Sequence, residues 1–376
     1  MSAENPRVDA KISAIACSSV HQSLIAAGTE SGSIGLFHNT GGIDFSPNRA
    51  MLRFSVQEGV GQRGHNYLVT ALQFLEEHIL VSSSRDGTIK LWDCTNNTHV
   101  LNVLNINSRD SVTALSVMNS STIIASGSAG GYVNVRDIRF NSGELDKGMK
   151  ARSSEISALA LSANDFEVTA ADSEGNIDVW DIRSTTNIPL LSLDGHETAA
   201  KAGKITEIPP VGPKSSTKTF VSEEIWDVAM GKKRKESGFT EHQKSISFPQ
   251  HASKGRSMEP AHKGKVLALG RIDSGIIGSV SIDKSAKLFC RLTGTLLGVC
   301  KFKEKPICAA LHGGVMCIGK REGFEVVNPI RSQLSSAGVN NTSTHVGPVS
   351  AATFVGDWGI CTGGTDRHIF VHRIEI

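Results

Sequence analysis

The sequence lacks a long hydrophobic run and a marked excess of charge of either sign. Its 376 residues contain 39 Lys and Arg against 37 Asp and Glu, which gives a net charge of +2. This balance excludes a protein that binds nucleic acid or an anionic membrane over its whole surface. No apolar stretch reaches the roughly 18 residues of a membrane-spanning helix, and no secretory signal is visible. We therefore expect a soluble protein of the cytoplasm, the nucleus or both, with no membrane partner.

Paired cysteines are also missing. The seven cysteines are scattered singly, and an odd number without metal-ligand spacing argues against a disulfide framework and a zinc site. His368 and His372 have the spacing of a metal-binding pair on a helix, but residues 369–376 alternate with a period of two. On a strand, about 13 Å would separate the two histidines. The sequence therefore predicts neither a metal nor a cofactor.

The sequence contains an internal repeat. One copy combines an apolar stretch at 69–74 with a second at 79–93 that includes an Asp-Gly turn, and it reads as strand, strand, tight turn, strand. The turn positions Asp86, Gly130 and Glu174 of three successive copies are 44 residues apart. Further copies occupy residues 12–38, 262–289, 306–327 and 345–372. A period of this length predicts a repeat fold.

These units resemble the WD40 repeat family, which has a period of about 40–45 residues and four strands per propeller blade. The best copy has Gly64-His65 at its start and Trp92-Asp93 at its end. The resemblance implies an all-β, seven-bladed WD40-type β-propeller, with eight blades as the alternative. It also implies that the ring closes through N-terminal residues 7–10 beside the last blade.

The family resemblance also implies a hydrogen-bonded structural tetrad within a blade. In the best copy the tetrad falls on four residues, His65, Ser84, Asp86 and Trp92. A second copy matches three of the four positions with His262, Ser281 and Asp283, and has Phe289 at the fourth. His345 and Asp366 match two positions in the last copy.

Residues 195–260 interrupt the period and contain five of the 11 prolines. We expect blades 1–4 in residues 1–194, a flexible basic insertion in 195–260, and blades 5–7 in 261–376, closed with the N-terminal segment. Gly195-His196 and Trp226-Asp227 leave a degenerate extra blade as the alternative. The cationic run comprises Lys232, Lys233, Arg234 and Lys235. It resembles a nuclear import signal, and the alternatives are a solvated linker or a casual RNA contact.

Two Asp-x-Arg boxes are the most specific functional signal. Asp137 with Arg139 ends the third copy and Asp181 with Arg183 ends the fourth, 44 residues further on. The stretch around Arg183 resembles the box of cullin-4 ubiquitin ligase substrate receptors, in which the Arg docks on the ligase's propeller adaptor. A planar guanidinium suits such a contact. The alternative is that both boxes only cap their blades.

No catalytic signature stands out. The Gly-rich pieces at 28–35 and 126–131 do not lead into helices and are expected to be hairpin turns. The sequence therefore predicts a protein that is not an enzyme and serves as an interaction scaffold in a multiprotein complex. Two alternatives stay open, which are a cullin-4 substrate receptor and a nuclear or nucleolar factor in ribosome or RNA-particle assembly. Nucleic acid is then expected to be contacted only indirectly or through the basic insertion.

Overall fold

A computed structural model gives the arrangement of most of the repeats. It describes residues 8–18, 24–38, 64–76, 78–94, 99–105, 110–118, 122–139, 147–151, 153–162, 166–184, 188–195, 205–207, 219–222, 259–273, 275–328, 345–356 and 359–373. These residues form antiparallel β-sheets and contain no helix, which confirms the predicted all-β class.

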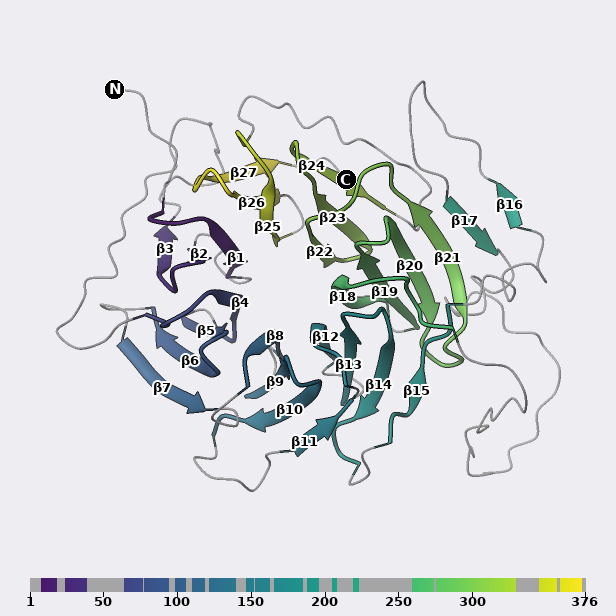
Figure 1. Cartoon of the computed structure of the whole chain (residues 1–376), viewed down its shortest axis with the longest axis horizontal. Helices are drawn as coiled ribbons and strands as arrows, with labels where there is room; N and C mark the ends of the chain where they lie inside the picture. Colours follow the sequence, from purple (N-terminus) through teal and green to yellow (C-terminus); the bar gives the residue numbers. More distant parts are fainter. Residues whose placement is uncertain are drawn as a thin grey trace.

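The described strands fall into seven sheets, which we number as blades 1–7 in chain order (Figure 1). Blade 1 contains β1 (Ile12–Cys17), β2 (Leu24–Thr29) and β3 (Ile34–His38). Blade 2 contains β4 (Val69–Phe74), β5 (Ile79–Ser84), β6 (Thr88–Asp93) and β7 (His99–Asn105). Blade 3 contains β8 (Val112–Val117), β9 (Ile123–Ser128), β10 (Tyr132–Asp137) and β11 (Lys147–Lys150). Blade 4 contains β12 (Ile156–Ser162), β13 (Glu167–Asp172), β14 (Ile177–Asp181) and β15 (Leu191–Ser192).

The remaining strands form blades 5 to 7. Blade 5 has six strands, which are β16 (Ile205–Glu207), β17 (Thr219–Ser222), β18 (Val266–Asp273), β19 (Ile276–Ser281), β20 (Ser285–Cys290) and β21 (Leu296–Lys301). Blade 6 contains β22 (Cys308–His312), β23 (Val315–Gly319) and β24 (Phe324–Val327). Blade 7 contains β25 (Val349–Val355), β26 (Gly359–Gly364) and β27 (Ile369–Arg373). Within each blade neighbouring strands pair antiparallel and follow the sequence order, except in blade 5, where β17 pairs with β21.

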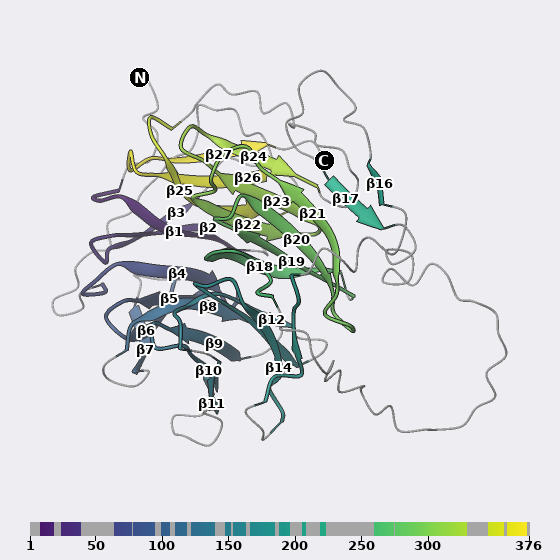
Figure 2. The ribbon, with the colours of Figure 1, turned by 45° about the vertical axis from the view of Figure 1, so that its right-hand side comes forward.

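The blades stand around a central axis with their first full-length strands innermost (Figures 1 and 2). These inner strands contact one another in the closed circuit β1, β4, β8, β12, β18, β22, β25 and back to β1. The arrangement is that of a WD40-type β-propeller. The seven-blade count for the complete chain stays a prediction.

Neighbouring blades are joined in the same way at several points of the ring. The hydroxyl of Thr113 in β8 donates to the carbonyl of Ile156 at the start of β12, with 2.6 Å between the oxygens. Gly127 in β9 lies beneath the Ile156 side chain so closely that a Cβ there would be 2.4 Å from it. A small residue in the second strand therefore makes room for a β-branched residue of the next blade, which packs the apolar core between the sheets.

The N-terminal segment lies against both blade 1 and blade 7. The Val8 amide donates to the carbonyl of Arg367, with 3.0 Å between nitrogen and oxygen. The Asp9 carboxylate accepts hydrogen bonds from the hydroxyls of Ser31 and Ser33, at 3.1 and 2.7 Å. Residues 8 and 9 therefore bridge the first and last blades, on the side where the sequence predicts closure.

The insertion starts and ends at one place on the propeller. The Gly195 amide lies 3.3 Å from the carbonyl oxygen of Glu259, to which it donates. Between them, β17 pairs with β21 and β16 pairs with β17, so two short strands extend blade 5 outward (Figure 1). The basic run at 232–235 lies outside the described residues. Its assignment to a flexible insertion stays a prediction.

Candidate functional site

The blades define two rims that carry different side chains. Rim 1 carries the loops that enter the inner strands and the turns between second and third strands, such as the turn at 85–87 between β5 and β6. Rim 2 carries the turns between inner and second strands and the connections that follow the third strands, such as residues 182–184 and 188–190 after β14. The tetrads open onto rim 1, and both Asp-x-Arg boxes lie on rim 2.

The blade 2 network links a loop, a strand, a turn and an indole. His65 Nδ1 lies 3.0 Å from Asp86 Oδ2, and His65 Nε2 lies 2.7 Å from Ser82 Oγ. The Trp92 indole donates to the same Ser82 oxygen at 2.8 Å. Because an ionised carboxylate only accepts, the proton of the contact between His65 Nδ1 and Asp86 is donated by the imidazole.

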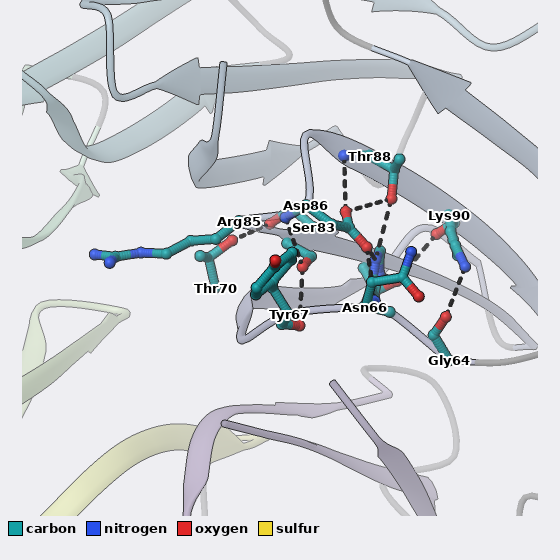
Figure 3. A network of polar contacts seen from close by, with 12 residues as sticks. Gly64, Asn66, Tyr67, Thr70, Ser83, Arg85, Asp86, Thr88 and Lys90 are labelled. Carbon is teal, nitrogen blue, oxygen red and sulfur yellow. Dashed lines mark hydrogen bonds and ion pairs between the residues drawn. The ribbon is translucent and has the colours of Figure 1, made fainter. Parts of the chain in front are cut away.

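The serine in this network is Ser82, which corrects the sequence-based assignment to Ser84. The Ser84 hydroxyl instead donates to the Tyr67 carbonyl at 3.0 Å and accepts from the Asp86 amide. Both hydroxyls point to the same face of β5, and only Ser82 reaches the indole. Figure 3 shows Asp86 also held by Thr88 and Asn66 at the rim 1 side of the blade.

The Ser82, His65 and Asp86 side chains have the connectivity of a hydrolytic triad, but burial gives them another role. Ser82 has no exposed surface, and its oxygen accepts the Trp92 indole proton. A nucleophile must reach a substrate, and this oxygen is enclosed by its own blade. The network is therefore structural, since a buried polar network stabilises a core when each member has a partner.

Blade 5 contains the same network with one substitution. His262 lies 2.9 Å from Asp283 and 2.7 Å from Ser279 Oγ. Ser279 therefore takes the place that the sequence assigned to Ser281, whose hydroxyl donates to the Gly264 carbonyl. Phe289 is fully buried at the indole position.

Blade 7 contains a complete four-membered network. The sequence match assigned only two of its members, because the other two differ in residue type from those of blade 2. His345 lies 2.9 Å from Asp366 and 3.0 Å from Thr362 Oγ1. His372 stands where blade 2 has its tryptophan, and its Nε2 lies 3.0 Å from the same threonine oxygen. A threonine hydroxyl and an imidazole thus replace the serine and the indole.

Blade 4 retains the tryptophan without its acceptor. Trp180 is 2% exposed, and its indole nitrogen has no hydrogen-bond partner. Ala170 occupies the position equivalent to Ser82, so no hydroxyl faces the ring. The rim 1 turn is held by Asp172, which accepts from the Ser154 hydroxyl at 2.6 Å and from the Asn176 amide at 2.8 Å.

Two aspartates and one histidine of these networks have pKa values below their usual range. Burial alone would raise the pKa of Asp86, but hydrogen bonds from His65 and Thr88 outweigh it and hold this pKa well below its usual range. Asp283 behaves in the same way beside His262. Desolvation lowers the pKa of His372 to about 4. All three groups therefore keep their neutral-pH charge state deep into acid.

On rim 2, the two Asp-x-Arg boxes adopt one geometry. Arg139 Nε donates to Asp137 at 3.1 Å, and Arg183 Nε donates to Asp181 at 3.0 Å; in each pair a second guanidinium nitrogen bonds the same carboxylate. The hydrogen bonds from Arg139 are the main cause that lowers the pKa of Asp137 to about 2. The side chains of Arg139 and Arg183 are 66% and 62% exposed. The structure thus orients both guanidinium groups at the surface of adjacent blades.

A buried acid joins blades 4 and 5 on the same rim. Glu167, at the start of β13, accepts from Arg271 at 2.6 Å and from Arg291 at 2.7 and 3.0 Å. Its neighbour Phe166 has a positive φ of 52° and is 41% exposed. The Arg183 guanidinium stacks over the Phe166 ring at 4.9 Å. None of these contacts was predicted, and those of Glu167 join residues more than 100 positions apart.

Comparison with known proteins agrees with this architecture. Residues 58–93 match the family model described as WD domain, G-beta repeat. The matched residues end at Asp93, the last residue of β6, and include the whole blade 2 network. The chain thus carries a WD40 repeat and has a WD40-type β-propeller fold, which confirms the predicted resemblance.

Three relatives share part of the sequence. The nuclear pore complex protein nup43 of Dictyostelium discoideum is 31% identical over 119 residues, which cover 30% of this chain and 27% of that protein. The WD repeat-containing protein RUP1 of Arabidopsis thaliana is 37% identical over 79 residues, 20% of each chain. The restriction of telomere capping protein 1 of Clavispora lusitaniae is 32% identical over 92 residues, 24% of this chain and 7% of that protein. The matches therefore span about a quarter or less of each relative's length.

Among the described residues, no His, Cys, Asp and Glu side chains come together in groups of three or more that could hold a metal ion. The described part of the chain has no helix that is long and apolar enough to cross a membrane.

Proposed function

We propose that the protein is a non-catalytic interaction scaffold within a multiprotein complex. The observation that supports this role most directly is the ring itself, in which every inner strand contacts its two neighbours. Such a ring holds loops from different blades in fixed positions, so that contact side chains lose little entropy on binding. Partial similarity to a nuclear pore complex protein supports membership of a complex and a nuclear link.

Affinity purification of the full chain from native cells, followed by size-exclusion chromatography and mass spectrometry, tests the scaffold role. The expected result is a stoichiometric assembly of at least two other proteins that elutes well above the 40.0 kDa monomer. A chain that elutes alone at physiological salt would contradict the proposal. Expression of the purified partners together with the chain then shows which of them bind directly.

A second candidate is docking on the cullin-4 ligase adaptor through rim 2. It is favoured by the matched geometry of Arg139 and Arg183, whose exposed guanidinium groups are held in place by Asp137 and Asp181. Ordered, exposed arginines are typical of binding hot spots. The Arg139→Ala, Arg183→Ala double variant should lose the adaptor from the purified material while retaining the wild-type melting temperature. If the adaptor is missing from both samples, docking is refuted and the boxes only cap their blades.

Nuclear import through the run Lys232–Lys235 is a separate proposal from the sequence. Four clustered cations in a chain of nearly balanced charge fit an acidic partner groove. Replacing all four with Ser should shift a fluorescent fusion from the nucleus to the cytoplasm. Unchanged nuclear signal would contradict it. A role in ribosome or RNA-particle assembly further requires that ribosomal or RNA-binding proteins appear among the partners.

A further inference from the structure

The exposed hydrophobic side chains are unevenly distributed between the two rims. Eight large hydrophobic side chains are exposed among the described residues. Four of them lie in the loops of rim 1 or at the strand ends next to this rim. The other four are Phe166, Ile188, Leu190 and Leu292, and all of them belong to rim 2 at blades 4 and 5. On the described parts of rim 2, large exposed hydrophobics thus occur at this one junction.

Each of these four residues lies at or next to a residue that makes a polar contact at the junction of blades 4 and 5. Leu292 follows Arg291, whose guanidinium binds Glu167, and Glu167 follows Phe166. Leu190 donates its amide to the Val179 carbonyl at 2.7 Å, two residues before Asp181, the partner of Arg183. The side chains of Ile188, Leu190 and Leu292 are 72%, 53% and 69% exposed. Exposed apolar side chains grouped with an arginine are typical of a contact surface.

The conformation of Phe166 indicates that the group is built for contact. A positive φ is unfavourable for a bulky residue, and such strain persists where the surrounding structure imposes it. Here the Ile182 amide donates to the Phe166 carbonyl at 2.9 Å, and the ring lies under the Arg183 guanidinium. Asp181 fixes the Nε edge of that guanidinium. The stacked pair is therefore ordered before any partner arrives.

The charges at this junction favour a partner with carboxylates. Glu167, a carboxylate of the junction, is 8% exposed and already bonded to two arginines. Arg183 is 62% exposed, whereas the carboxylate of Asp181 is 22% exposed. Beside Phe166 the accessible charge is thus mainly the Arg183 guanidinium, set among aliphatic and aromatic side chains, and the exposed carboxylate of Asp273 lies at the end of β18 in blade 5. A planar guanidinium binds a carboxylate with two parallel hydrogen bonds.

We propose that Phe166, Arg183, Ile188, Leu190 and Leu292, which we term the rim 2 patch, form a docking surface for a partner protein segment in which carboxylates alternate with aliphatic or aromatic side chains. The carboxylates accept hydrogen bonds from the edge of Arg183 that Nη1 and Nη2 form, next to the Nε edge that Asp181 holds. The apolar side chains cover Phe166, Ile188 and the two leucines. This inference rests on the scaffold role and specifies one of its surfaces. It does not involve Arg139, on which adaptor docking through paired boxes depends.

Site-specific photocrosslinking in the full chain, expressed in its native cells, tests the proposal. A photoreactive phenylalanine analogue replaces Leu190 or Leu292, and the matched control replaces Val346, which is 90% exposed on rim 1. The expected result is a cross-link from both rim 2 positions to one segment of another protein that contains at least two carboxylates and two large apolar residues. Mass spectrometry of the cross-linked peptide reads this composition directly.

The identified segment is then made as a synthetic peptide, and its affinity for the full chain is measured. Arg183→Ala and Leu190→Glu should each weaken binding at least tenfold, while Val346→Glu and Arg139→Ala should change it less than twofold. Circular dichroism and melting temperature verify that the variants remain folded. Cross-links to residues of this same chain, cross-links to a segment without carboxylates, or no cross-links would each overturn the proposal.

The outcomes also separate this inference from the scaffold role. A chain that still elutes in its wild-type assembly but gives no cross-link at either rim 2 position refutes the patch and leaves the scaffold intact. A chain that elutes alone refutes both.

Discussion

Replacement of Ser82 by Ala removes one oxygen on which two other side chains of blade 2 depend. Ser82 Oγ accepts from the Trp92 indole at 2.8 Å and lies 2.7 Å from His65 Nε2. Both partners are about 5% exposed, so water does not replace the hydroxyl. Each buried polar group left without a partner costs about 1–3 kcal/mol. We expect the free energy of unfolding to fall by about 2–4 kcal/mol.

The reverse change in blade 4 supplies a matched test. Ala170→Ser places a hydroxyl where the indole nitrogen of Trp180 is buried without a partner. It should stabilise the protein by about 0.5–1.5 kcal/mol, the net value of one hydrogen bond. Ser84→Ala is the control, because Ser84 bonds only main-chain groups at the rim. It should cost about 1 kcal/mol.

Urea denaturation, followed by tryptophan fluorescence and far-ultraviolet circular dichroism, measures all three variants. The comparison is valid where the m-value is unchanged, so that a shift in midpoint reports stability. A Ser84→Ala loss equal to or larger than that of Ser82→Ala would refute the position of the serine in the network. A destabilising Ala170→Ser would refute the argument that the indole lacks only an acceptor.

Four further predictions concern the fold. Trp92→Ala should destabilise by about 3–5 kcal/mol, since it empties a buried aromatic site, and a loss below about 1 kcal/mol in urea titration would contradict the tetrad. The free energy of unfolding should fall as pH drops from about 6.5 towards 4, because desolvation lowers the pKa of His372 in the folded protein to about 4, whereas an unfolded histidine binds its proton near 6.5. In acid titrations, His372→Phe should reduce the slope of stability against pH. Lys284→Gly should stabilise by about 0.5–1 kcal/mol in thermal melts because Lys284 has a φ of 68°, and no gain would show that the strain is relieved elsewhere. Deleting 201–256 should leave a folded propeller by circular dichroism because the stem residues Gly195 and Glu259 already touch, whereas unfolding would favour the eight-blade alternative.

The repeat period was sufficient to predict the strands of most blades. Residues 69–74 and 79–93 become β4, β5 and β6 with boundaries close to those expected. The reason is physical, because alternating apolar positions and Gly-containing turns are local properties of the chain. Gly175 illustrates this, since its φ of 98° in the turn between β13 and β14 favours glycine.

The members of the networks were harder to predict. Ser82 and Ser84 have the same chemistry on the same face of β5, and only the pairing register with β6 decides which of them is near Trp92. In blade 7, Thr362 and His372 supply the right hydrogen-bonding groups in residues that a search by identity passes over. A search by donor and acceptor class at the four spaced positions would have found them.

The two rims should respond differently to mutation, and this difference links the structure to the proposed role. On rim 1 the polar side chains of blades 2, 5 and 7 are buried and bonded to their own blade, so substitutions there act on folding. On rim 2 the guanidinium groups of Arg139 and Arg183 are exposed on adjacent blades, so their replacement leaves the core intact. Loss of a partner without loss of stability is therefore expected only from rim 2 among these sites. A scaffold whose binding surface lay on the tetrad rim would show the opposite pattern, with Asn66 or Tyr67 variants that fold normally and lose the complex.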